Sequence, residues 1–381
     1  MPGSEKAEDF RDRVRTWLAE HLRGEFAALR GLGGPGREHE AFEERLAWER
    51  ELATGGWNCL GWPVEHGGQG ATLEQQVVFH EEYALADAPA KVGHFGQELL
   101  GPTLIAFGSP EQQRRFLPPI VAAEELWCQG YSEPGAGSDL AAVSTSARLE
   151  GDEWVITGQK VWTSLAQHAD WCFVLARTEP GSVRHHGLSY LLVPMRQSTI
   201  DVRPIRQLTG TAEFNEVFFD GARTERGLVV GEPGDGWRVA MGTLAFERGV
   251  ATLGQQVGFR RELTALTELA RGLDDPVVAE RIDRAWVGLE VMRAHAVRTL
   301  GDTSPGTASV AKLVWANWHK SLGELAMLVR GAAGMAAPDG LDEWQRLYLF
   351  TRADTIYGGS DEVQRNIIAE RVLGLPREAR G

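Results

Sequence analysis

The spacing of hydrophobic residues changes twice along this chain of 381 residues. In the first third, apolar residues recur every three or four positions, as amphipathic helices require. From about Cys128 the pattern becomes short β-rich runs bounded by turn residues, and from Gly236 the helical spacing returns and lasts to the end. We therefore expect an N-terminal α-helical domain (1–125), a central antiparallel β-domain (126–232) and a C-terminal helical domain (233–381).

Each region contains several expected elements. The N-terminal helices are expected over Arg11–Leu22, Ala41–Thr54, Leu73–Ala86 and Pro110–Ala123. The strands are expected over Trp154–Thr157, Trp171–Ala176, Leu188–Val193 and Val217–Phe219. Further helices are expected along the stripe Val239–Val257 and over Val277–Leu300, Ala308–Val329, Leu341–Tyr357 and Asp361–Val372, the last with Ser360 as its N-cap.

Composition excludes several classes of protein. The chain has 39 lysines and arginines against 53 acids, a net charge of −14, which argues against nucleic acid or an anionic membrane as the main partner. No stretch approaches the ~18 apolar residues of a membrane span, and no signal peptide opens the chain. Cys59, Cys128 and Cys172 lack the spacing of a disulfide framework or a metal site. We expect a soluble, cytoplasmic protein without a metal.

The segment Tyr131–Asp139 (YSEPGAGSD) is the strongest candidate for a binding loop. Pro134 restricts one backbone angle and the two glycines after it free the next ones. Such a turn points backbone N–H groups outward, toward an oxygen-rich ligand, and Ser132 and Ser138 add hydroxyl groups. No lysine follows, so the segment is not a phosphate-binding P-loop. Taken alone, such a turn is more often an ordinary loop, so whether it binds a ligand depends on evidence from the other segments of the chain.

Four segments together carry a resemblance to the acyl-CoA dehydrogenase family. They are YSEPGAGSDLA (Tyr131–Ala141), GQKVWTSLAQHAD (Gly158–Asp170), FNEVFFD (Phe214–Asp220) and YGGSDEVQRNIIAERVLGLP (Tyr357–Pro376). The segment GWPVEHGGQGA (Gly61–Ala71) is similar to that family too. The resemblance covers nearly the whole chain. It implies an N-terminal helical domain, a central β-domain and a C-terminal four-helix bundle, with FAD between the last two.

The chemistry of that family has three requirements. Desaturating an acyl thioester removes a proton from the α-carbon and a hydride from the β-carbon. The hydride needs a flavin, the proton needs a positioned carboxylate, and the developing enolate oxygen needs hydrogen-bond donors. The resemblance therefore implies an FAD-dependent oxidoreductase of lipid metabolism that takes an acyl-CoA or acyl-carrier thioester and passes electrons to a partner such as an electron-transfer flavoprotein.

By the same resemblance, the flavin ring is bound by the central domain. Ser132 would hydrogen-bond the pyrimidine edge of the ring, Trp162 would flank it and Ser164 would contact it near N5, with backbone from Tyr131 and Thr163.

The resemblance also assigns the ends of the two ligands. Ser138, beside Gly137, would lie along the CoA portion, although a plain turn serine fits that position equally well. The remaining residues would line the diphosphate and adenosine end of FAD: Gly359, Ser360 and Glu362.

The catalytic base is where the chain departs from the commoner family pattern. Many members place a glutamate directly after the tyrosine of the last motif, where this chain has Gly358, whose N–H could still hold the thioester oxygen. A minority place it on the first bundle helix before an arginine, and Glu247-Arg248 stand there. Helical spacing surrounds Glu247 with small or apolar residues, Thr243, Leu244, Val250, Ala251 and Gly254. Partial desolvation raises the pKa of such a carboxyl. We expect Glu247 to be the base and Arg248 to face the polar end of the substrate; the alternative is a solvated Glu247–Arg248 pair.

Two other functions stay open: a flavin monooxygenase on the same fold, and a non-catalytic partner subunit. The acyl chain also stays open between straight, branched, steroid side-chain and carrier-bound forms.

The assembly is a separate question, because family members usually complete each FAD site with a neighbouring subunit's Arg-x-x-Phe-Gly and a glutamine before a Gly-Gly pair. The corresponding stretches here, Leu269–Asp275 (LARGLDD) and Leu328–Gly334 (LVRGAAG), lack the Phe-Gly and the glutamine. By resemblance to heteromeric bacterial relatives, we expect the base-bearing subunit of an α2β2 assembly. The competing hypothesis is a homo-oligomer in which Arg271 or Arg330 substitutes for the lost arginine.

Overall fold

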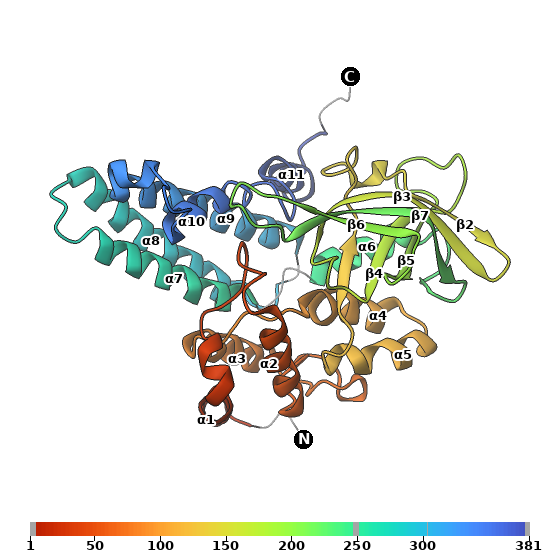
Figure 1. Cartoon of the computed structure of the whole chain (residues 1–381), viewed down its shortest axis with the longest axis horizontal. Helices are drawn as coiled ribbons and strands as arrows, with labels where there is room; N and C mark the ends of the chain where they lie inside the picture. The colour runs from red at the N-terminus through yellow and green to blue at the C-terminus, as the bar shows by residue number, and fades with distance from the viewer. Residues whose placement is uncertain (1–4, 247–250, 303, 378–381) are drawn as a thin grey trace. The chain divides into compact units, whose positions relative to one another are not determined.

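The computed structural model describes residues 5–246, 251–302 and 304–377 (Figure 1). The chain divides into two compact units. Unit 1 comprises Met1–Val78 and Ala86–Gly249, and unit 2 comprises Phe79–Leu85 and Val250–Gly381. Along the chain, helices are followed by strands and then by helices again. This order confirms the predicted fold class, whereas the three domain boundaries stay predictions.

The N-terminal part of unit 1 consists of helices that each bury an apolar face. The first, α1 (Ala7–His21), buries Phe10, Val14 and Leu18, which lie on one side of a helix because they are three or four residues apart. The others are α2 (Phe42–Thr54), α3 (Leu73–Leu85, whose second half is grouped with unit 2), α4 (Gly101–Phe107) and α5 (Pro110–Val121), with short 3₁₀ or π helices at Gly24–Leu29, Val64–His66 and Phe95–Leu100.

The rest of unit 1 is an eight-stranded sheet followed by one helix. The strands are β1 (Trp127–Gly130), β2 (Ser146–Glu150), β3 (Glu153–Ser164), β4 (Trp171–Arg177), β5 (Leu188–Pro194), β6 (Ile200–Ile205), β7 (Phe214–Glu225) and β8 (Val229–Val230). Their order is β6-β7-β3-β2-β4-β5-β8, and β1 pairs with β4. Figure 1 shows β3 and β7 side by side over most of their lengths. The pairs are antiparallel as predicted, except that β1 runs parallel to β4 and β2 meets the end of β4 in parallel.

Alternate residues of β5 face two separate cores. Tyr190 and Leu192 pack with residues of α4, α5 and α6 (Gly236–Phe246), whereas Leu191 and Val193 pack in a core made largely of other strands. Side chains alternate between the faces of a strand, so β5 is apolar on both sides because both faces of the sheet are covered there.

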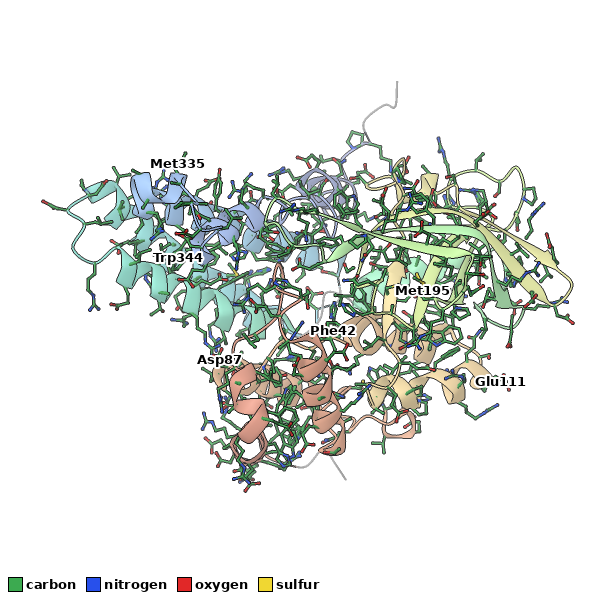
Figure 2. The ribbon with its side chains drawn as sticks, in the orientation of Figure 1. Phe42, Asp87, Glu111, Met195, Met335 and Trp344 are labelled. Carbon is green, nitrogen blue, oxygen red and sulfur yellow. The ribbon has the colours of Figure 1, made fainter. Side chains whose placement is uncertain are left out.

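Unit 2 is helical and has its own core. Its helices are α7 (Ala251–Leu269), α8 (Pro276–Arg298), α9 (Pro305–Arg330), α10 (Glu343–Thr351) and α11 (Asp361–Ile367), with a 3₁₀ helix at Gly331–Met335 and a π helix at Ile368–Val372. The core contains Phe259, Leu263, Leu322 and Trp344. Figure 2 marks Trp344 in this unit, together with the exposed Met335.

One predicted helix differs from the structure, and another lies partly outside the described residues. The helix predicted over Leu341–Tyr357 ends at Thr351, and tight turns follow in which N–H groups bond three residues back, as from Asp354 to Thr351 at 3.3 Å. The stripe Val239–Val257 corresponds to α6 and the start of α7, with residues 247–250 outside the described part of the chain. Among the described residues, no helix combines the length and the hydropathy that crossing a bilayer requires.

Candidate functional site

The predicted binding loop Tyr131–Asp139 is tied down by a buried glutamate. Glu133 and Ala136 exchange backbone hydrogen bonds of 3.1 and 3.0 Å, which close the turn. One carboxylate oxygen of Glu133 accepts from the N–H and the hydroxyl of Ser144, both at 2.7 Å, and the other accepts from the Thr145 N–H at 2.9 Å. The turn is therefore fixed at its base. Gly137 at its tip is exposed, and no other atom lies within 4 Å of the position that a β-carbon would take there.

Lys160 on β3 completes this anchor. Its side chain is fully buried, and its Nζ donates to Glu133 Oε1 at 2.8 Å, to the Tyr131 carbonyl at 3.0 Å and to the Leu175 carbonyl at 2.7 Å. These three bonds use all the hydrogens of an ammonium group. The pair thereby joins the binding loop to β3 and β4.

The charges of this pair stabilise each other. Burial by itself raises the pKa of Glu133, but the Lys160 ammonium and the hydrogen bonds from residues 144 and 145 outweigh burial and lower that pKa to about 2. Burial lowers the pKa of Lys160, and Glu133 opposes that shift. Because both ends have a full set of partners, the pair is ionised near neutral pH.

Trp162 lies where the pairing of β3 with β7 is interrupted. The register shifts between Lys160 and Thr163, and Trp162 has a φ of 60°, a left-handed conformation that is unfavourable for a bulky residue. Its side chain is 57% exposed and touches Phe214 edge to face, with ring centroids 6.1 Å apart. A strained bulge that holds an aromatic ring out of the core is the kind of feature that clusters at ligand sites.

The residues beside Trp162 are polar and close to the binding loop. The Val161 N–H donates to the Ser132 carbonyl at 2.9 Å, so the two segments are in direct contact. Thr163 is buried, and its hydroxyl has no hydrogen-bond partner within the described chain; Ser132 and Ser164 are half-buried. The structure thus brings together the unit 1 residues predicted for the flavin ring. An exposed indole, an unpaired buried hydroxyl and an open glycine turn fit a planar, hydrogen-bonding group such as FAD.

The predicted residues of unit 2 form a second, separate set. Gly358 and Gly359 have φ values of 64° and 88°, a conformation that glycine adopts without strain. Ser360 caps α11 as predicted, because its hydroxyl accepts from the Val363 N–H at 3.4 Å. Gln364 holds the turn by donating to the carbonyls of Gly358 and Gly359, both at 3.2 Å.

The start of α11 carries its own negative charge. Glu362 is exposed, and hydrogen bonds with its own backbone and with Ser360 lower its pKa. Asp361 is buried beside Asn317, whose amide donates to it at 2.8 Å. These two acids already place negative charge at the N-terminus of α11, where the helix dipole is positive. The predicted contact with the FAD diphosphate therefore depends on the glycine turn rather than on the helix itself.

The predicted base, Glu247, and its neighbour Arg248 lie outside the described residues. The helix before them, α6, ends at Phe246 and is fixed by Thr243, whose buried hydroxyl lies 2.8 Å from that of Thr103.

Sequence reasoning missed the residues that hold the site. Glu133 and Lys160 stand inside the quoted motifs, but their charges give no local sign of burial. One signal was available for Lys160: it occupies an inward position in a strand whose alternate residues are buried. In unit 2, the buried His319 was also overlooked.

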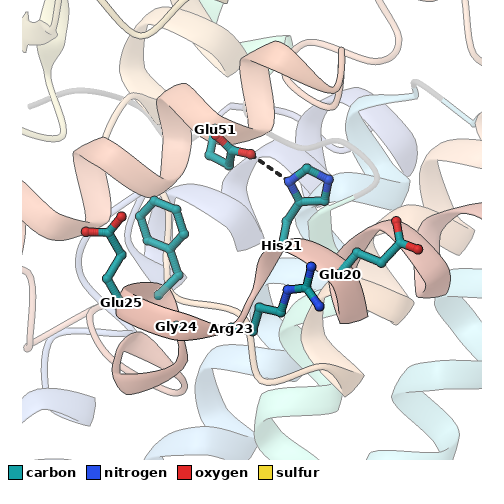
Figure 3. Close-up of a pocket in the computed structure, with 7 residues that line it drawn as sticks. Glu20, His21, Arg23, Gly24, Glu25 and Glu51 are labelled. Carbon is teal, nitrogen blue, oxygen red and sulfur yellow. Dashed lines mark hydrogen bonds and ion pairs between the residues drawn. The ribbon is translucent and has the colours of Figure 1, made fainter.

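A surface hollow of about 480 Å³ lies elsewhere in unit 1 (Figure 3). Within the hollow, Nδ1 of the His21 ring lies 2.6 Å from Glu51 Oε1. The hollow is lined by Glu20, His21, Arg23, Gly24, Glu25, Phe26 and Glu51. None of these is a predicted site residue, and the three acids make the hollow unsuited to phosphates.

Comparisons with known proteins agree across the whole chain. Residues 4–124, 128–222 and 234–373 match the N-terminal, middle and C-terminal domains of acyl-CoA dehydrogenases. The chain is 69% identical to the acyl-CoA dehydrogenase IpdE1 of Mycobacterium tuberculosis, over 98% of this chain and 99% of that protein.

Solved structures give the same result. A structure of the ChsE4-ChsE5 complex from Mycobacterium tuberculosis matches with a TM-score of 0.82 and 30% identity, covering 98% of each chain. A structure of the Tcur3481-Tcur3483 steroid ACAD matches with a TM-score of 0.83 and 29% identity, again over 98% of each chain. The chain therefore belongs to the acyl-CoA dehydrogenase family, whose members are flavoprotein oxidoreductases.

Proposed function

We propose that this enzyme desaturates an acyl-CoA thioester between its α- and β-carbons with FAD as the hydride acceptor. The observation that carries the proposal is the exposed Trp162, held at a strained bulge of β3 directly after Val161, whose N–H bonds to the Ser132 carbonyl of the loop. An aromatic ring held out of the core in this way offers a flat apolar face beside polar groups, which a flavin ring requires.

The unit 1 residues would bind and orient the ring. Ser132 and Ser164 are half-buried hydroxyl groups that can donate to ring oxygens or nitrogens, and the Thr163 hydroxyl lacks a protein partner within the described residues. When bound, FAD supplies the hydride acceptor that the side chains cannot provide. In unit 2, Gly359, Ser360 and Glu362 would line the diphosphate and adenosine end.

Proton removal is assigned to Glu247. The sequence offers no carboxylate at position 358, and the backbone there has a positive φ that favours glycine. A glutamate at position 247 is the remaining candidate from the family pattern, with Arg248 at the polar end of the substrate. The Gly358 N–H would donate to the thioester oxygen, whose charge increases as the α-proton leaves.

A similar solved structure supports a proposal for the substrate class. The Tcur3481-Tcur3483 enzyme is a steroid ACAD. We propose a CoA thioester with a bulky polycyclic acyl group, with Ser138 along the CoA portion and an electron-transfer flavoprotein as electron acceptor.

We further propose that the enzyme works as a heteromer with a related subunit. Two similar structures each contain two named proteins, ChsE4 with ChsE5 and Tcur3481 with Tcur3483. The two arginines that a homo-oligomer would use are already paired, Arg271 with Glu268 and Arg330 with Asp342. In addition, α8 exposes Val287 and Val291 on one face, each more than half accessible, as expected of a face that another subunit covers.

The test begins with the protein isolated from its own host under native conditions, so that any second subunit is retained. We expect a yellow complex with two kinds of chain, whose bound flavin is bleached anaerobically by a steroid side-chain CoA ester and reoxidises slowly in air. Rapid reoxidation by oxygen with hydroxylated product would support the monooxygenase. A self-assembled homo-oligomer with one FAD per chain and full activity would rule out the heteromer.

The flavin contacts are tested by substitution. The double variant Trp162→Ala/Ser132→Ala should fold, because neither side chain is fully buried, yet should purify with less flavin. Phe218→Ala, which removes an aromatic ring from the same sheet under Arg203, is the matched control. A doubly substituted protein that is fully yellow and fully active would show that the placement is wrong.

A further inference from the structure

Unit 2 contains a buried histidine held between two carboxylates. His319 on α9 has its Nδ1 2.7 Å from Asp354 Oδ2 and its Nε2 3.0 Å from Glu262 Oε2 on α7. Each of these contacts needs one hydrogen between nitrogen and oxygen, and the imidazolium form supplies both while the two carboxylates stay ionised. The geometry therefore favours a protonated histidine, which packs against the Phe259 ring at a centroid distance of 4.5 Å.

Asp354 connects this histidine to the segment that precedes the glycine turn. Its second carboxylate oxygen accepts from the Tyr357 hydroxyl at 2.8 Å, and its backbone carbonyl accepts from Lys312 Nζ. The Lys312 ammonium also lies 4.7 Å from the centre of the Tyr357 ring. Asp354 is fully buried, so these contacts fix the chain from Asp354 to Tyr357 in one arrangement.

The fixed segment leads directly into the predicted substrate turn. Gly358 follows Tyr357 without an intervening residue, and the Asp361 N–H bonds back to the Thr355 carbonyl at 3.0 Å. The turn is thus bounded by the Asp354 contacts on one side and by the start of α11 on the other. Gly358 and Gly359 have positive φ values and no side chains that would restrict the backbone. The position of the turn therefore depends on the Asp354 contacts before it and on Gln364 of α11, which donates to both glycine carbonyls.

We propose that His319 is a positioning residue for the Gly358–Gly359 turn: by holding Asp354, and through it Tyr357, it aims the Gly358 N–H at the thioester oxygen, and it releases the turn when it loses its proton. The inference rests on the proposed role of Gly358. The charged and titratable groups around His319 in the described part of unit 2 are Glu262 from α7, Lys312 from α9, and Asp354 and Tyr357 from the segment after α10.

The protonation state of His319 sets the expected pH range. Burial lowers the pKa of His319, but the hydrogen bonds and charges of Asp354 and Glu262 outweigh burial and raise that pKa to about 9. Below that pH the imidazolium bridges both carboxylates. Above it one bridge is lost, and the buried Asp354 and the partly exposed Glu262 face a neutral ring, so the anchor weakens as the pH rises.

The deciding measurement is amide hydrogen exchange of peptides covering residues 355–361 in the holoenzyme, corrected for intrinsic rates, at pH 7 and pH 10. The wild type should lose protection about tenfold between the two, the equivalent of one hydrogen bond. His319→Gln should be equally unprotected at both pH values. Tyr357→Phe, a milder change that keeps the histidine, should lose part of the protection at pH 7. Glu324→Gln, which breaks the exposed Arg352–Glu324 pair nearby, should behave as the wild type.

Kinetics separate this inference from the proposed function. If the enzyme desaturates its acyl-CoA, His319→Gln should lower kcat/KM about tenfold at pH 7, mainly through kcat, with FAD content unchanged, and should abolish the decline of kcat/KM near pH 9. An enzyme inactive on every thioester would defeat the proposed function, and the exchange data would still decide the role of His319. Unchanged protection in His319→Gln, or altered protection with wild-type kcat/KM and pH profile, would overturn the inference.

Discussion

The two units bury charge in different ways. In unit 1, Glu133 and Lys160 form one pair whose remaining positions are filled by backbone and hydroxyl groups. In unit 2, His319 is shared between two carboxylates. Glu133 does not titrate near neutral pH, since its pKa is about 2, whereas His319 titrates near 9. The carboxylate that anchors the Tyr131–Asp139 loop therefore stays ionised from neutral to alkaline pH, whereas the contacts that precede Gly358 change near pH 9.

The largest expected effect comes from breaking the unit 1 pair. Lys160→Met leaves Glu133 buried without its partner, which costs roughly 3–5 kcal/mol of unfolding free energy and frees the Tyr131–Asp139 loop. Urea unfolding and the FAD dissociation constant would measure both consequences. Arg196→Met, which removes an exposed partner of Asp170, is the control and should change stability by about 1 kcal/mol or less. If Lys160→Met matched this control in stability and FAD affinity, the pair would not be an anchor.

The second effect concerns the pH dependence of stability. The pKa of His319 rises from 6.5 in the unfolded chain to about 9 in the folded one, so its contribution is complete below pH 6.5 and declines until it is lost above pH 9. The full contribution is on the order of 3 kcal/mol. We expect the difference in unfolding free energy between wild type and His319→Gln to shrink by that amount from pH 6 to pH 10.

A second histidine serves as the control for that measurement. His21→Gln breaks a partly exposed contact with Glu51 in unit 1, and its effect on stability should be small. Glu133 should contribute nothing to the slope between pH 6 and pH 10, because it loses its contribution only as the pH falls toward 2. Burial lowers the pKa of Lys160, but its contribution is common to wild type and His319→Gln and cancels in their difference. A pH-independent difference between wild type and His319→Gln would erase the contrast between the units.

The smallest expected effect comes from removing one hydroxyl group in each unit. Ser144→Ala and Tyr357→Phe each remove one hydroxyl that donates to a buried carboxylate, Glu133 in unit 1 and Asp354 in unit 2. Each should cost about 1 kcal/mol at pH 7. The cost of Ser144→Ala should stay constant from pH 6 to pH 10, whereas that of Tyr357→Phe should change near pH 9. Thermal melts of the two variants across this range would be the check, and parallel pH profiles would contradict the account.

Local patterns predicted the parts of the fold that local forces decide. The order of helices and strands followed from hydrophobic spacing, and the Ser360 cap followed from a serine before two acids. The end of α10 at Thr351 was missed because it coincides with distant contacts: Asp354 bonds to His319, which is 35 residues away in sequence. The parallel pairing of β1 with β4 was missed for the same reason, since strand partners are not encoded in the period of either strand.

In the candidate site, too, the residues within local motifs were predicted, whereas the contacts between distant residues were not. The resemblance named Tyr131, Ser132, Trp162 and Ser164, and the structure brings the two segments into contact. It did not reveal that Glu133 and Lys160 hold them together, because a buried charge looks like any other in sequence until its partner, 27 residues away, is placed beside it. The roles of these residues toward FAD stay predictions.

The central claim is that Glu247 removes the α-proton in an FAD-dependent desaturation. The most direct test mixes the natively isolated enzyme anaerobically with its best acyl-CoA and follows flavin bleaching by stopped flow, for wild type, Glu247→Gln and the exposed control Glu290→Gln. We predict that Glu247→Gln keeps its FAD and binds the thioester but bleaches ~10²–10⁴-fold more slowly, while Glu290→Gln matches the wild type. Near-native bleaching by Glu247→Gln would contradict the claim.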